Sequence, residues 1–208
     1  MASTQPRMQF GKLYHVFNRG LDRRNIFSEE EHYQTFFDLY ARHVHPVANT
    51  YAYCLLPNHF HLMVRIKSVS ELVASVPGIE SLGEKTLSGI PSQAFTSFFS
   101  AYSRALHQQP GQTANLFQHL YGCIPVTDKR QFLNVVLFIH QNPQRHRVCA
   151  DFRDWPQSSY RVLLGDEATF LDRGSVMEWF GKSDTYEAVH SMMLGPVDYE
   201  AFAGNDYD

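Results

Sequence analysis

Residues 51–64 read YAYCLLPNHFHLMV, and this stretch decides how the middle of the chain folds. Aromatic and aliphatic residues on both sides of Pro57 and Asn58 predict two strands, which the Pro-Asn turn joins as a hairpin. Residues two apart in a strand point to the same face. His59 and His61 therefore share one face of the second strand, and Phe60 lies with Leu62 and Val64 on the other, where helices can cover it.

Two imidazoles this close together can bind one divalent metal ion, because imidazole is a common ligand type. The alternative is a half-exposed strand that carries two histidines without a shared role. A metal ion needs a third ligand, and the predicted helix FLNVVLFIHQNP (residues 132–143) offers Asn142, whose amide oxygen suits Mg²⁺ or Mn²⁺. His140 or Gln141 is the alternative third ligand.

The segments around the hairpin predict an α+β fold. KLYHVFNRG (residues 12–20) and LYGCIPV (120–126) read as strands, and helical spacing of apolar residues continues to about Val44 and recurs in QAFTSFFSAYSRALH (93–107). Residues 67–93 read as a loop with one short helix or a mobile connection. Asp128 caps a further helix that Pro143 terminates. The order strand–helix–strand–strand–helix–strand predicts a ferredoxin-like (split βαβ) antiparallel sheet packed by helices. Short helices are expected after residue 164, in a C-terminal extension over residues 165–208.

Composition bounds the class of protein. The chain has 208 residues, of which 44% are hydrophobic, so it is globular rather than disordered. No apolar run approaches the roughly 20 residues that span a bilayer, and the N-terminus lacks the apolar core of a signal peptide. Three cysteines without a Cys-x-x-Cys pair favour a reduced, cytoplasmic setting.

Positive charge is local, because the net charge is −3. Arginine contacts to phosphate position nucleic acid, so the arginines near the first strand and after the helix predicted at residues 132–143 are candidate DNA contacts; the alternative is a solvated loop. His15 and Arg19 alternate with Phe17 on one face of the first strand, which can approach DNA or the metal site. The candidate DNA-binding residues are His15, Arg19, Arg23, Arg24 and Arg145.

Four segments together resemble the HUH single-tyrosine transposases, in particular the REP-associated tyrosine transposases: HVFNRG (15–20), YCLLPNHFHLMV (53–64), NLFQHLYGC (115–123) and VLFIHQNPQRHRVCADFRDWPQSSY (136–160). The resemblance implies that residues 1–164 form a nuclease domain that binds single-stranded or hairpin DNA. It also implies cleavage of one strand by a tyrosine hydroxyl, through a 5′-phosphotyrosine link, with Mg²⁺ or Mn²⁺ as cofactor. His59 and His61 match the two metal-binding histidines, and Asn142 matches the third ligand.

The chain departs from that pattern at the nucleophile. The matching position, four residues before the amide ligand, is Phe138, which keeps the ring but has no hydroxyl. Three explanations are open: an engineered Tyr-to-Phe replacement, a natural DNA-binding relic that does not cut, or another tyrosine as nucleophile. Tyr102 and Tyr121 are the nearest tyrosine candidates in sequence.

Two other classes of function are open. An RRM-like module shares the predicted topology, although its signature is absent from the sequence. A metal-dependent hydrolase would need a general base, and no acidic residue lies within the HFH, NLFQ or HQNP segments. The expected assembly is a monomer or a homodimer.

Overall fold

The computed structural model describes residues 7–76, 78–106, 116–117 and 120–192. Within these residues the strands are β1 (Leu13–Arg19), β2 (Ala48–Leu56), β3 (His59–Ile66) and β4 (Gly122–Val126). The helices are α1 (Glu30–His43), α2 (Val69–Ser75), α3 (Glu84–Leu106), α4 (Lys129–Arg145), α5 (Tyr160–Leu164), α6 (Arg173–Phe180) and α7 (Ser183–Ser191).

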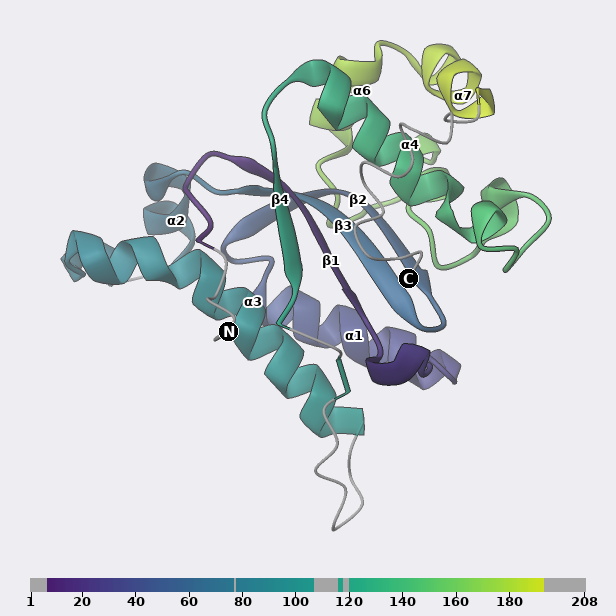
Figure 1. Ribbon diagram of the computed structural model, residues 1–208. Coiled ribbons are helices and arrows are strands. Elements are labelled where there is room, and N and C mark those ends of the chain that lie inside the picture. The colour runs from purple at the N-terminus through teal and green to yellow at the C-terminus, as the bar shows by residue number, and fades with distance from the viewer. Residues whose placement is uncertain (1–6, 77, 107–115, 118–119, 193–208) are drawn as a thin grey trace.

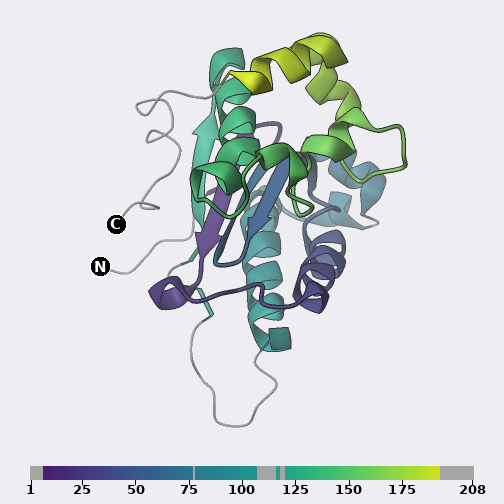
Figure 2. The same ribbon diagram turned by 90° about the vertical axis from the view of Figure 1, so that its right-hand side faces the viewer.

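The four strands form one antiparallel sheet in the order β2-β3-β1-β4. Helices α1 and α3 lie side by side on one face, and α4 crosses the other face over β2 and β3 (Figures 1 and 2). This arrangement confirms the predicted α+β, ferredoxin-like fold with a mostly helical C-terminal extension.

The side chains of β3 alternate as predicted, with one set facing the α1–α3 core and the other set facing α4. Phe60 is fully buried and packs its ring edge-on against Phe36 of α1, with Phe99 of α3 stacked at 5.6 Å between ring centroids. On the opposite face, His61 meets the ring of Phe138 from α4. One face of the strand therefore supplies the apolar core, and the other carries the histidines.

Two helix boundaries differ from the sequence-based expectation. Helix α3 begins at Glu84, inside the segment expected to be mostly loop. Helix α4 is capped by Asp128 as predicted, with the Gln131 N–H donating to its carboxylate, but it runs past Pro143 to Arg145. Proline removes only its own N–H from the helical ladder, and the His146 N–H still donates to the Asn142 carbonyl at 2.9 Å.

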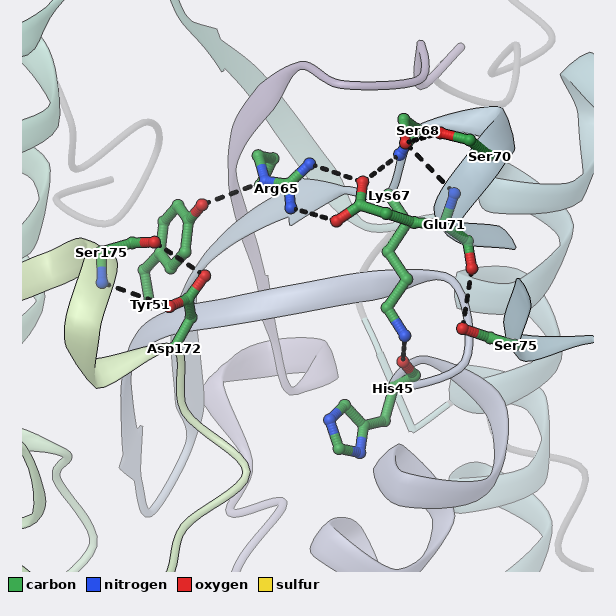
Figure 3. Close-up of polar contacts among 10 residues, drawn as sticks. All are labelled: His45, Tyr51, Arg65, Lys67, Ser68, Ser70, Glu71, Ser75, Asp172 and Ser175. Carbon is green, nitrogen blue, oxygen red and sulfur yellow. Dashed lines mark hydrogen bonds and ion pairs between the residues drawn. The ribbon is translucent and has the colours of Figure 1, made fainter. Parts of the chain in front are cut away.

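The far end of β3 has a structural role (Figure 3). Arg65, on the same face as the histidines, forms a two-pronged ion pair with Glu71 and donates to the Tyr51 hydroxyl. Glu71 also accepts from the Ser68 N–H, which completes the capping box of α2. These contacts lower the pKa of Glu71 to about 2 and attach α2 to the sheet.

The C-terminal helices pack on α4 and on the β2 edge of the sheet. Trp179 of α6 lies against Phe132 of α4, with ring centroids 4.4 Å apart, and the Asp172 N–H donates to the Thr50 carbonyl. The division into domains at residue 164 stays a prediction. None of the helices in the described part of the chain is long and apolar enough to cross a membrane.

Candidate functional site

The side of the sheet that faces α4 carries a group of residues that we call the histidine face: His15, Phe17 and Arg19 of β1, and His59 and His61 of β3. The strand register places Arg19 opposite His59 and Phe17 opposite His61. Because cross-strand neighbours lie about 5 Å apart, the ladder brings both segments singled out in the sequence into one surface.

His59 is held between two side-chain amides. Its Nδ1 lies 2.7 Å from Asn58 Oδ1, and its Nε2 lies 3.0 Å from Asn142 Oδ1. A neutral imidazole donates from one nitrogen only. If His59 donates from Nδ1 to Asn58, the lone pair of Nε2 faces the oxygen of Asn142, and a cation between these two atoms is favourable. Two ligands at about 2.1 Å from Mg²⁺ and at right angles are about 3.0 Å apart, so this spacing fits a shared ion.

His15 orients His61. The distance between His15 Nε2 and His61 Nδ1 is 2.9 Å, so His61 can coordinate only through Nε2. The rings of His59 and His61 are 5.3 Å apart between centroids. No group of three or more His, Cys, Asp or Glu residues with metal-binding geometry occurs within the described residues. The amide oxygen of Asn142 is the candidate third ligand beside His59. The donor set of two imidazoles and one amide oxygen is compatible with Mg²⁺ or Mn²⁺.

Phe138 lies where the sequence pattern places the nucleophile. Its ring centroid is 4.9 Å from that of His61 and 5.5 Å from that of His15, with both contacts edge-on. The side chain is completely buried, as is that of Asn142 one turn later. The helix therefore presents residue 138 to one end of the histidine face and residue 142 to the other.

His140 and Gln141 contact the C-terminal extension. His140 bonds to Ser159 Oγ through Nε2 and to His190 Nε2 through Nδ1, both at 2.8 Å. Gln141 donates to the carbonyls of His190 and Met192. Burial holds the pKa of His140 well below its usual range and lowers that of His190 to about 4. Neither alternative third ligand is brought to His59.

The two alternative tyrosines lie on the α3 side of the sheet. Tyr102 donates its hydroxyl to the Ile26 carbonyl at 2.7 Å, and Tyr121 donates to the Ser92 carbonyl at 3.4 Å. Burial raises the pKa of both phenols. The structure thus brings neither hydroxyl to the histidine face.

The loop after β1 contains Arg23 and Arg24, and we call it the arginine loop. It is hydrogen-bonded to the β2–β3 hairpin, which carries His59 and His61. The Gly20 N–H donates to the Asn58 carbonyl at 2.8 Å, beside His59. Asp22 and Arg23 have left-handed backbones, with φ of 53° and 58°, a conformation that costs energy in residues other than glycine. Arg23 and Arg24 are exposed, and Arg24 bonds back to the Leu21 carbonyl through Nε.

Two contacts at the site were not foreseen from the sequence. Asn58, read as a turn residue, contacts His59, and its place directly before the HFH motif was an available signal. His146, which directly follows Arg145, packs its ring 4.7 Å from that of His59, between centroids. Arg145 itself is half-buried at the end of α4.

The comparisons with known proteins support the fold. No family model matches the chain, and no curated protein matches it. A solved structure of a REP-associated tyrosine transposase bound to a REP hairpin is similar, with a TM-score of 0.58 and 12% sequence identity. The chain shares its fold. The match covers 83% of this chain and 94% of that one, so the likeness extends over nearly the whole of the transposase chain.

Proposed function

We propose that the chain is a transposase-like protein that binds single-stranded or hairpin DNA on the histidine face, and that Phe138 prevents it from cutting. One observation carries this proposal. Helix α4 places Phe138 against His61 and, one turn later, places Asn142 against His59. A tyrosine at 138 would bring a hydroxyl to the same imidazoles.

His59, His61 and Asn142 are the proposed ligands of Mg²⁺ or Mn²⁺. When bound, the ion would supply charge neutralisation and a template for a DNA phosphate. Asn58 and His15 orient the two imidazoles through their second nitrogens, as outer partners of metal ligands commonly do. The protein thus preorganises the phosphate site before DNA arrives.

Arg19, Arg23, Arg24 and Arg145 are the proposed phosphate contacts. Arg19 lies opposite His59 on the sheet, and the Arg23–Arg24 loop is bonded to the hairpin at Asn58. A DNA strand that follows these residues would place a phosphate at His59. The hairpin bound in the similar structure supports the choice of DNA as the ligand.

In the cleaving form, a tyrosine oxygen at position 138 would attack phosphorus and the bond to the 3′ oxygen would break. The products would be a 5′-phosphotyrosine link and a strand that ends in a 3′-OH, so rejoining would need no nucleotide cofactor. Phenylalanine has no oxygen to form that link. The unchanged chain therefore binds DNA without cutting it, and the Phe138→Tyr variant would be the metal-dependent strand transferase.

The test compares the unchanged chain with Phe138→Tyr on labelled hairpin DNA with Mn²⁺. Native gels should show binding by both proteins, and a denaturing gel should show a covalent adduct only for Phe138→Tyr. Binding without an adduct from that variant would favour a domesticated DNA-binding protein. An adduct from the unchanged chain would identify another nucleophile, and absence of binding by both proteins would refute the proposal.

A further inference from the structure

An aromatic ring of the histidine face has no role in the site described so far. Phe17 lies in the middle of β1, between His61 on one neighbouring strand and Gly122 on the other. Its side chain is half-buried, whereas His15 and His61 beside it are completely buried. Among the described elements, helix α4 packs on β2 and β3 rather than on β1 and β4 (Figure 1).

Gly122 makes room for the ring. A Cβ atom built on Gly122 would overlap the Cε1, Cε2 and Cζ atoms of Phe17, so the ring occupies the volume that a side chain on β4 would fill. The ring therefore lies across the edge strand. An alanine at 122 would have to displace it.

The ring also adjoins the proposed phosphate site. Its centroid is 5.8 Å from that of His61 and 5.0 Å from that of His15. Arg19 follows on the same face, opposite His59. An anionic chain held at the histidines and at Arg19 would pass beside this half-buried ring.

We propose that Phe17 is a stacking platform for one nucleobase of the bound strand, the base next to the phosphate at His59 and His61. This inference rests on the proposed function, since it requires a single-stranded nucleic acid on the histidine face. Bases stack on exposed aromatic rings with little sequence preference, because every base has a π face. The platform therefore contributes affinity and sets the position of the strand, without reading a particular base.

The experiment is an abasic scan of a single-stranded oligonucleotide that the unchanged chain binds, with affinity measured in the absence of Mn²⁺. Removing the stacked base should weaken binding by roughly 5- to 150-fold at one position. Phe17→Leu, which keeps an apolar side chain without a π face, should bind the intact strand correspondingly more weakly. In Phe17→Leu, removal of that base should weaken binding little further. In Phe17→Trp, removal of the base should weaken binding as much as in the unchanged chain.

Gly122→Ala provides a second test, because it displaces the ring without removing it. It should reduce the same position-specific penalty, whereas Gly89→Ala, at an exposed glycine whose added Cβ meets nothing within 4 Å, should leave it unchanged. If each abasic position weakens binding equally in Phe17→Leu and in the unchanged chain, Phe17 is not a stacking platform. That result would leave the proposed function unaffected. Absence of single-stranded or hairpin DNA binding by the unchanged chain would overturn both.

Discussion

Helix α4 separates two groups of histidines that differ in their partners. On one side is the histidine face, where His59 and His61 contact Asn142 and Phe138. On the other side is the C-terminal cluster, which comprises His140, Ser159, Tyr186 and His190. Both groups are almost completely buried, so burial alone does not distinguish them.

The C-terminal cluster forms a chain of hydrogen bonds that two neutral imidazoles can satisfy. Ser159 donates to His140 Nε2, His140 donates from Nδ1 to His190 Nε2, and His190 donates from Nδ1 to the Tyr186 carbonyl at 2.7 Å. Protonation of both rings would point two N–H groups at each other across the contact between His140 Nδ1 and His190 Nε2. This cluster therefore stabilises the fold, and its low pKa values follow from burial.

The histidine face differs because its partners are amides and a second imidazole. His59 has amide oxygens at both ring nitrogens, a set that a neutral ring cannot satisfy by donation alone. We therefore expect the atoms that face each ring nitrogen, rather than the number of histidines, to distinguish a ligand-binding cluster from a structural one. Four predictions test this contrast and are given in order of decreasing magnitude.

The largest effect is expected from His59→Ala combined with His61→Ala. Loss of a single outer partner of a metal ligand typically costs 10- to 100-fold in metal affinity, so loss of two ligands should weaken Mn²⁺ binding by more than about 100-fold. Titration calorimetry would measure this, with His43→Ala as the control. Unchanged Mn²⁺ affinity in the double variant would show that the ion binds elsewhere.

His140→Ala should act on stability. It leaves Ser159 and His190 without their shared partner and opens a cavity, so the free energy of unfolding should fall by about 3 kcal/mol. Urea unfolding would measure the change. His43→Ala, at a half-buried histidine outside the cluster, is again the control. A loss below about 1 kcal/mol would contradict the structural role given to the C-terminal cluster.

The same cluster predicts a dependence of stability on pH. His190 has a pKa lowered to about 4 in the folded chain, against about 6.5 when unfolded, so between these values the unfolded chain binds more protons. Stability should be complete above pH 6.5 and should fall by roughly 2–3 kcal/mol towards pH 4. His190→Gln should reduce this slope, measured as unfolding free energy at a series of pH values. An unchanged slope in that variant would assign the effect to other groups.

The smallest effect is expected in the arginine loop. Replacing Arg23 and Arg24 together by Ala should weaken DNA binding by about tenfold at low salt, and about equally for all sequences. The slope of log affinity against log salt should become shallower by about 1.4 for a single strand. Binding assays at several salt concentrations would measure both quantities, and an unchanged slope would remove the loop from the DNA path.

Local patterns determined much of this protein from the sequence. Alternation in residues 59–64 predicted which side chains face the core, and the strand–helix order predicted the fold. The i, i+4 spacing of Phe138 and Asn142, evident in the sequence, is that of residues on one helical face. At 3.6 residues per turn, His140 lies about 200° around the helix from Phe138. The sequence therefore also indicated that His140 is not on the helical face of Phe138 and Asn142.

The contacts between different elements follow from the three-dimensional packing and not from local sequence patterns. The contact of His59 with Asn142, the bond between His15 and His61, and the position of Phe17 over Gly122 join segments far apart in the chain. Periodicity specifies the face on which a side chain lies, but the strand register and the path of α4 across the sheet determine its neighbours. These depend on packing of the whole core, and for that reason the same residue type serves a candidate metal site on one side of α4 and the stability of the fold on the other.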